Sequence, residues 1–193
     1  MRVLIACEYS GTVRDAYIKQ GHDAMSCDLL PTDSEGPHYQ GNVFDVINDG
    51  WDLMIAHPPC TYLSVSGMHW TSRGLRDPQL TEDALDFVRQ LMDAPIDKIA
   101  IENPVSVISS RIRKPDQIVQ PWWFGDDASK KTCLWLKNLP KLTPTNMLQG
   151  DSKTRRANQT ETGQNKLPPS KDRWKIRSKT YQGIAHAMST QWA

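Results

Sequence analysis

The chain lacks any run of apolar residues near the ~18 that a membrane-spanning helix needs. It also lacks a signal-peptide pattern, because only one basic residue and five apolar residues precede Cys7 and Glu8. With 38% hydrophobic and 23% charged residues, the composition is that of an ordinary globular protein. We therefore expect a cytoplasmic protein that does not enter a membrane.

Cysteine and metal-binding patterns are scarce as well. The four cysteines form no Cys-x-x-Cys pair, which argues against a zinc cluster and against the disulfide framework of a small secreted protein. His22, His38, His69 and His186 show no spacing typical of metal ligands. The sequence therefore predicts a reduced protein without a bound metal ion.

The total charge is close to zero, but the charges of the two halves are not. The formal net charge is +1. Residues 1–110 hold 7 basic and 16 acidic residues, a net charge of −9, whereas residues 111–193 hold 16 basic and 6 acidic residues, a net charge of +10. This asymmetry indicates an anionic partner for the basic half, unless the two halves neutralise each other within one domain. Charge alone leaves both interpretations open.

The length and the apolar pattern define the expected fold class. A chain of 193 residues suits one well-packed domain, so we expect a single domain over residues 1–193. The predicted strands are residues 2–6, 23–27, 51–56 and 98–101, and the predicted helices are residues 12–20 and 80–92. Strands that are apolar along most of their length predict an α/β protein with a Rossmann-like, doubly wound, mostly parallel sheet covered on both faces.

The part of the chain after residue 140 has a different composition. Residues 143–173 are rich in Thr, Asn, Gln, Gly, Pro and basic residues and contain few large apolar ones. This composition predicts an extended loop rather than a second core. Residues 178–192 return to a helical composition.

Unusual residues lie at the carboxyl ends of the predicted strands, where doubly wound sheets bind ligands. The turn Glu8-Tyr-Ser-Gly11 follows the first strand, and Asp28 follows the second. A glycine turn lets backbone amides approach a ligand, and a carboxylate at the second strand end can bind ribose hydroxyls. Because no G-x-G-x-x-G pattern is present, a plain structural turn is an equal alternative.

Cys60 and Glu102 follow two further strands. Two prolines precede Cys60, which predicts a stiff loop at the sheet edge, where a thiolate can act as a covalent nucleophile. The alternative is an inert, buried cysteine. Glu102 can serve as an acid or a hydrogen-bond acceptor, or can simply cap a turn. For His57, just before the prolines, we expect a loop hydrogen bond, with loop orientation or receipt of a proton as the alternative.

Together, these motifs resemble those of the cytosine-C5 DNA methyltransferase family, specifically a compact, phage-like branch of it. The resemblance covers residues 3–139, with a weaker echo in Tyr181-Gln-Gly-Ile-Ala185. Residues 3–11 resemble the first cofactor motif, Asp28 the ribose-binding acid, residues 41–45 the segment whose Asp45 contacts adenine, residues 52–64 the catalytic Pro-Cys motif, and Glu102-Asn103 the base-binding Glu-Asn motif.

The resemblance implies the class I S-adenosylmethionine-dependent methyltransferase fold together with its cofactor. The implied cofactor-binding residues are Glu8, Tyr9, Ser10, Gly11, Asp28, Asp45 and Pro58. Glu8 and Ser10 stand where the family commonly has glycines. A modified sulfonium analogue is therefore the alternative cofactor.

The implied reaction is methylation of cytosine at C5. Cys60 would add to C6 as a thiolate, which makes C5 enamine-like and able to attack the sulfonium methyl group. Glu102 would hydrogen-bond the N3 and amino edge of the base and favour protonation of N3. A base then removes the C5 proton and Cys60 is eliminated. In duplex DNA the target base must first be flipped out of the stack.

The resemblance also implies how DNA, the predicted partner, would be bound. The family's Gln-x-Arg-x-Arg motif is best matched by residues 124–132, in which Lys130 and Lys131 replace the arginines. The family's target-recognition domain is reduced to a basic loop, residues 141–177, which can contact phosphates or, alternatively, is a disordered, solvated loop. The predicted substrate-binding residues are Asn103, Lys130, Lys131, Arg155, Arg156 and Arg173.

Two other functions stay open at this point. The missing recognition domain is compatible with modification of a free cytosine nucleotide or of RNA. The altered Thr61, Pro104 and lysine positions are compatible with a non-catalytic nucleic-acid-binding or decoy protein that keeps the fold without turnover. Among the tryptophans, we expect Trp135 in the core and Trp122 or Trp123 at the border of the base pocket.

Overall fold

A seven-stranded sheet forms the centre of the protein, with strand order β3-β2-β1-β4-β5-β7-β6. The computed structural model describes all 193 residues except the side chain of Ser66. The strands are β1 Arg2–Ala6, β2 Asp23–Asp28, β3 His38–Gln40, β4 Leu53–Ala56, β5 Lys98–Pro104, β6 Gln117–Val119 and β7 Thr132–Lys137. Strands β1 to β5 pair in parallel, and β7 runs antiparallel between β5 and β6. The predicted mostly parallel, Rossmann-like sheet is confirmed.

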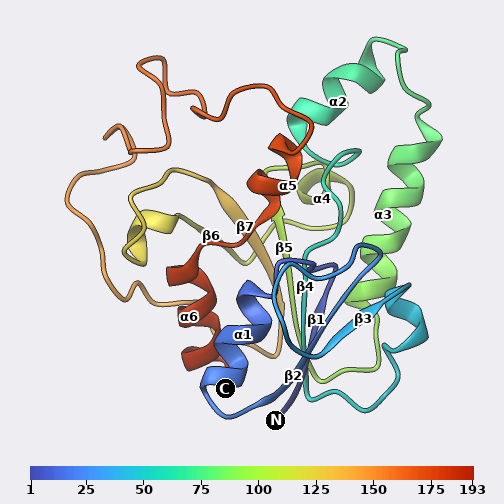
Figure 1. Ribbon diagram of the computed structural model, residues 1–193. Coiled ribbons are helices and arrows are strands. Elements are labelled where there is room, and N and C mark those ends of the chain that lie inside the picture. Colours follow the sequence, from blue (N-terminus) through green and yellow to red (C-terminus); the bar gives the residue numbers. More distant parts are fainter.

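Helices cover both faces of this sheet, as Figure 1 shows. The helices are α1 Thr12–Lys19, α2 Val65–Ser72, α3 Gln79–Met92, α4 Ile108–Arg111, α5 Arg173–Ser178 and α6 Gln182–Gln191, with 3-10 turns at Val43–Asp45 and Pro121–Trp123. Helices α1 and α6 pack in one hydrophobic cluster with β1, and α3 packs in a second cluster on the opposite face. The chain is therefore doubly wound, as its alternating strand and helix pattern predicts.

Strand β4 shows why an uninterrupted apolar segment forms a central strand. All four of its residues are fully buried. Leu53 and Ile55 belong to the cluster beneath α1 and α6, whereas Met54 and Ala56 belong to the cluster beneath α3. Because successive side chains of a strand point to opposite faces, a strand between two helical layers must be apolar at every position.

The structure contains several short elements that the sequence pattern does not predict. Strands β3 and β6 have three residues each, too few for a periodic signal. Helix α5 lies within the segment expected to be loop and buries none of its side chains, so no apolar stripe reveals it. Between β7 and α5, where every residue is described, no helix or strand forms, in agreement with the predicted extended loop.

The long loop is attached to the rest of the protein by amide side chains. Gln117 both donates to and accepts from the backbone of Leu142, at 2.8 and 2.7 Å, and Gln191 does the same with Thr143, at 2.9 and 2.8 Å. Asn158 pairs in the same way with the backbone of Ser129, at 3.1 and 2.9 Å.

None of the helices among the described residues is long and apolar enough to cross a bilayer.

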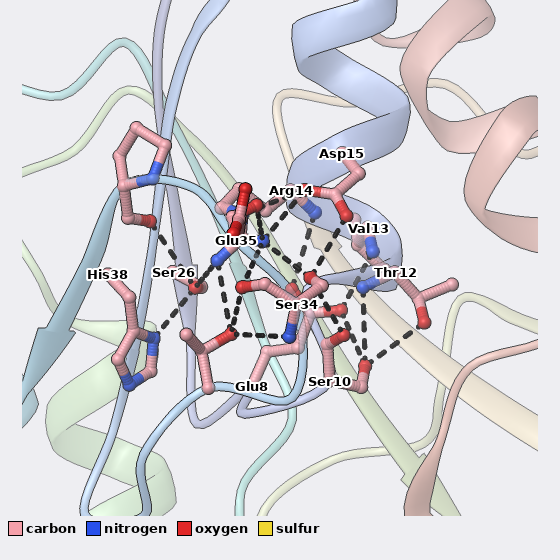
Figure 2. A network of polar contacts seen from close by, with 12 residues as sticks. Glu8, Ser10, Thr12, Val13, Arg14, Asp15, Ser26, Ser34, Glu35 and His38 are labelled. Atoms are coloured by element: carbon pink, nitrogen blue, oxygen red, sulfur yellow. Dashed lines mark hydrogen bonds and ion pairs between the residues drawn. The ribbon is translucent and has the colours of Figure 1, made fainter.

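A fully buried arginine fixes the loop between β2 and β3 (Figure 2). Arg14 Nε donates to Asp15 Oδ1 at 2.8 Å, and Nη1 donates to the hydroxyls of Ser26 and Thr32 at 3.1 and 3.2 Å. Its Nη2 donates to the Ser34 hydroxyl at 2.6 Å and to the Glu35 carbonyl at 3.0 Å. The guanidinium thus takes the place of a hydrophobic core for this loop, holding it against α1 through directed bonds.

We expect Arg14→Met to lower the free energy of unfolding by about 3–5 kcal/mol, because it leaves several buried acceptors without a donor. Arg89→Met is the matched control, since the ion pair of Arg89 with Asp86 is exposed on α3 and should contribute less than about 1 kcal/mol. Urea unfolding of both variants makes the measurement. Equal losses for the two would contradict the structural role of Arg14.

Candidate active site

The carboxyl ends of β1, β4 and β5 meet at one edge of the sheet. Ala6 pairs with Ala56, and Ala56 pairs with Ile101, so the next residues along each strand, Cys7, His57 and Glu102, lie beside one another. The backbone N–H of His57 donates to the Ala6 carbonyl at 2.9 Å and extends this alignment beyond the strand. This edge is where open α/β sheets bind their ligands.

The Cys60 loop is held rigidly at this edge. Pro58 is buried, Cys60 is exposed, and the Cys60 carbonyl accepts from the backbone N–H groups of Leu63 and Ser64 at 3.1 and 2.9 Å. The Ser64 hydroxyl then caps α2 by accepting from the Gly67 N–H at 3.1 Å. Backbone hydrogen bonds therefore shape the turn after the prolines, and Cys60 is exposed rather than packed in the core.

Glu102 and Asn103 bind the residues before Cys60. One oxygen of the buried Glu102 carboxylate, Oε2, lies 3.1 Å from His57 Nδ1. The side-chain amide of Asn103 donates to the Pro58 carbonyl at 2.8 Å. Asn103, predicted to bind substrate, is thus used at least in part to position the loop, and its Oδ1 is buried without a partner among the described residues.

The protonation states of the two candidate catalytic groups differ from their ordinary ones. Burial alone would raise the pKa of Glu102, but the charge of Lys130 and hydrogen bonds from His57 and Thr132 outweigh it, so the pKa is lowered. Desolvation, followed by the charge of Glu102, raises the pKa of Cys60, although Lys130 partly opposes the shift. At neutral pH the site therefore holds a carboxylate beside a protonated thiol.

Lys130 and Lys131, predicted to take the place of two arginines, have different surroundings. Lys130 is half-buried, and its charge acts on both Glu102 and Cys60. Its ammonium donates to the Lys179 carbonyl at 3.3 Å. Lys131 is exposed, and its charge acts instead on Cys133. Lys130 is thus placed at the candidate site, and Lys131 is directed away from it.

The first cofactor motif is largely engaged in internal contacts. The buried Glu8 carboxylate accepts from the N–H groups of Val13 and Arg14 at 2.7 and 3.3 Å and from the Ser10 hydroxyl at 3.1 Å. It therefore satisfies the free donors at the start of α1. Gly11 has a φ of 72°, and a Cβ there would overlap the Ser34 hydroxyl. A glycine is needed here because the β2–β3 loop packs on the turn.

The acids expected to hold a ribose and an adenine remain accessible. Asp28 is half-buried, and its Oδ1 accepts from the Leu30 N–H at 2.9 Å. Burial raises the pKa of Asp28, and the Leu30 bond and two histidine rings partly oppose the shift. Leu29 beside it is 74% exposed. Asp45 is exposed and accepts from the Tyr39 hydroxyl at 3.1 Å.

Helix α5 lies over the first motif and is attached only by polar contacts. Lys175 and Lys179 pair with Asp33 at 2.8 and 2.9 Å and lie over the ring of Tyr9, at 4.8 and 5.9 Å from its centre. The Tyr9 hydroxyl bonds to the Lys175 carbonyl and lies 3.1 Å from the Ser178 hydroxyl. Figure 1 shows α5 above the carboxyl ends of β4 and β5.

Of two further residues in this region, Asp33 is missed by sequence reasoning, whereas Arg177 is predicted only as part of the basic loop 141–177. The charge of Arg177 on α5 acts on Cys60 and opposes the rise of its pKa. Asp33 holds α5 through its two lysines, and these hydrogen bonds lower the pKa of Asp33. The basic composition around Arg177 is visible in the sequence, but the partner of Asp33 is 142 positions away, and no local pattern connects them.

The remaining arginines of the basic segment are placed differently. Arg155 is exposed and Arg173 is half-exposed at the start of α5. Arg156 is only 5% exposed, with its guanidinium 4.6 Å above the ring of Trp122 and one N–H donated to the Gln149 carbonyl at 3.1 Å. Arg156 therefore packs the loop rather than facing solvent, so we do not include it in the proposed substrate contacts.

Three tryptophans differ in burial, and potential metal ligands do not cluster in the part of the chain that the structure describes. Trp135 is buried in the core, as expected. Trp122 is buried as well, whereas Trp123 is partly exposed and its indole N–H has no hydrogen-bond partner among the described residues. The described part of the chain contains no group of three or more His, Cys, Asp or Glu side chains arranged to hold a metal ion.

Comparisons with known proteins find likeness in structure but not in sequence. No family model matches the chain, and no curated protein matches it. Among solved structures, the Entamoeba histolytica methyltransferase EhMeth is 15% identical over 77% of this chain and 57% of its own, with a TM-score of 0.52. A protein described as a DNA modification methyltransferase encoded within an E. coli prophage is 14% identical over 70% of this chain and 46% of its own, with a TM-score of 0.45.

This chain thus spans about half the length of the solved structures that it resembles. The likeness to the Entamoeba protein, together with the seven-stranded, mostly parallel sheet, identifies the fold as a Rossmann-like methyltransferase fold. The fold class implied by the sequence motifs is confirmed.

We expect alkylation of Cys60 by iodoacetamide to accelerate with pH through a midpoint above the ordinary thiol value of about 8.5. Glu102→Gln should lower the midpoint, because it removes a negative charge that opposes the thiolate. Lys130→Met should raise it, and Lys131→Met is the matched control that should leave it unchanged. A midpoint unaffected by Glu102→Gln would show that the two groups are not coupled.

Proposed function

We propose that the protein transfers a methyl group from S-adenosylmethionine to C5 of cytosine in DNA, through a covalent bond between Cys60 and C6 of the base. The observation that carries the proposal is the pairing of an exposed thiol with a buried carboxylate, both under the charge of Lys130, at the ligand-binding edge of a methyltransferase fold. A nucleophile beside a base is the arrangement that covalent catalysis requires.

The protonation states of Cys60 and Glu102 suggest where the thiol proton goes during the addition step. As the Cys60 sulfur bonds to C6, its proton passes to the Glu102 carboxylate, which is ionised and therefore able to receive it. Glu102 then gives the proton to N3, so the base gains one proton and the enzyme loses one. The positive charge of Lys130 stabilises the thiolate as it forms. After methyl transfer, a base removes the C5 proton and Cys60 leaves.

The residues at the end of β2 and in the 3-10 turn after β3 fit the proposed cofactor. When bound, S-adenosylmethionine supplies an electrophilic sulfonium methyl group. Asp28 would bind its ribose hydroxyls, the exposed face of Leu29 would pack on its adenine, and Asp45 would accept from the adenine amino group. Glu8, the departure that raised a modified sulfonium analogue, caps α1 instead, so we propose the ordinary cofactor.

DNA is the substrate that best fits the charges around Cys60. Helix α5 carries an exposed face with Trp174, 58% exposed, together with Arg173 and Arg177. Exposed aromatic and basic side chains next to a reactive edge suit stacking on an extruded base and contact with phosphates. Arg155 on the preceding loop is a further exposed basic residue.

The covalent mechanism makes a direct prediction. Incubation with cofactor and DNA containing 5-fluorocytosine should trap a covalent adduct, because fluorine at C5 cannot leave as a proton. Cys60→Ala should abolish the adduct, and Cys27→Ala, which removes a buried core thiol, should retain it. Denaturing electrophoresis and mass spectrometry detect it. A wild-type protein that forms no adduct and no 5-methylcytosine would favour a non-catalytic binding protein.

The preference for DNA over RNA or a free nucleotide can be measured directly. Methyl transfer to duplex DNA, RNA and dCMP is compared at low enzyme concentration, with nucleosides analysed by mass spectrometry. We expect duplex DNA to be preferred, because the basic surface on α5 can contact a polymer of phosphates but adds little for a free nucleotide. Preference for RNA or for dCMP would replace DNA in the proposal.

The role of α5 is tested by DNA binding without turnover. We expect Trp174→Ala to weaken binding by roughly 1–3 kcal/mol through lost stacking. Arg177→Ala should reduce the slope of log affinity against log salt by about 1. Lys19→Ala is the control, because Lys19 lies exposed at the opposite end of α1, away from the carboxyl edge. Equal effects of all three would remove α5 from the interface.

A further inference from the structure

His57 follows β4, which lies in the sheet between β1, the strand before the proposed cofactor motif, and β5, the strand that carries Glu102. Its Nδ1 lies 3.1 Å from Glu102 Oε2 on β5. Its charge also acts on Asp28 at the end of β2 and opposes the rise of that carboxyl's pKa. The side chain is 10% exposed. This largely buried ring therefore lies between the strand that leads to the proposed cofactor motif and the strand that carries the proposed base-binding carboxylate.

The backbone around His57 leaves the ring little freedom. Its N–H is bonded to the Ala6 carbonyl at 2.9 Å, and the next residue is the buried Pro58, whose carbonyl accepts from Asn103. Proline restricts the conformation of the residue before it. A ring held in this way can fix the orientation of the carboxylate that it contacts.

The Nε2 atom of His57 is the unexplained feature. Because Glu102 is ionised and can only accept, the proton of the His57–Glu102 bond belongs on Nδ1, and Nε2 is the ring nitrogen left for another partner. Nε2 is buried and has no hydrogen-bond partner among the described residues. Buried polar atoms rarely lack a partner, so this atom points to a bound molecule as its partner.

We propose that His57 is a positioning residue that links the two ligands: its Nδ1–H holds one oxygen of Glu102, leaving the other for the base, and its Nε2 forms a hydrogen bond with the proposed cofactor. This inference rests on the proposed function and extends it. The charged groups that face the pair are Asp28 from β2, Glu102 from β5 and Lys130 from the segment before β7.

Two substitutions separate the two ring nitrogens. The amide of His57→Asn reaches the place of Nδ1 and can still donate to Glu102, but nothing remains at Nε2. The amide of His57→Gln reaches the place of Nε2 and can form a hydrogen bond there, but the donor to Glu102 is lost. Both variants bury one amide at the same position, so their effects on folding are comparable and thermal unfolding verifies this.

The expected results differ between kcat and KM. His57→Asn should keep kcat within about threefold of the wild type and raise KM for the cofactor. His57→Gln should lower kcat roughly 10- to 100-fold with KM for the cofactor nearly unchanged, the loss expected for one hydrogen bond to a charged group. Without the His57 donor the pKa of Glu102 rises, so the acidic limb of the kcat/KM profile should move to higher pH in His57→Gln only.

Each alternative result overturns the inference. Wild-type kinetics in both variants would exclude a positioning role, and equal losses with an unchanged pH profile would reduce His57 to a structural residue. If the wild type itself transfers no methyl group, the proposed function fails, and the His57–Glu102 contact is then tested by spectroscopy, which needs no turnover.

Nitrogen-15 spectra of labelled histidine should show a protonated Nδ1 in the wild type and a changed tautomer in Glu102→Leu. The same tautomer in both would overturn the contact.

Discussion

The attachment of the β4 loop to the end of β5 is the constraint on which the candidate site depends. Two neighbouring residues of β5 make it: Glu102 contacts His57, and Asn103 bonds to the Pro58 carbonyl. Parallel pairing of β4 with β5 brings the strand ends together, but pairing alone leaves the loop beyond them free. These two polar contacts determine where the chain goes next, and hence where Cys60 is presented. They also require a buried carboxylate, which stays ionised only because cationic and donor groups surround it.

Much of this arrangement can be predicted from the sequence because its signals are local. The central strands β1, β4 and β5 are apolar along nearly their whole length, and parallel strands bring Asp28, Cys60 and Glu102 to one edge by topology. Other features depend on partners distant in the chain. Glu8 occupies a cofactor motif but caps α1, and Arg156 belongs to a basic segment but packs on Trp122. A charged residue does not reveal by its type whether its charge faces solvent or the interior.

The opposite charges of the two halves are used in both of the ways that the sequence allows. Part of the basic half is neutralised by the acidic half, since Lys175 and Lys179 pair with Asp33 across the first motif. Another part lies on the outer surface, where Arg155 and Arg177 form no ion pair with a described residue. Internal neutralisation and attraction of a polyanion are therefore compatible in one small fold, because they involve different side chains of the same segment.

Helix α5 buries none of its side chains, although it stands over the centre of the site. Most substitutions near an active site disturb packing, which restricts how far such a site can diverge. On α5 this restriction is absent for the outward residues, because Trp174, Ile176 and Arg177 support no part of the core. Substitutions at these positions can therefore change what this surface contacts while the sheet and the Cys60 loop keep their packing. Within Arg173 to Lys179, side chains that attach the helix to the first motif therefore stand beside side chains whose exchange would leave the fold intact.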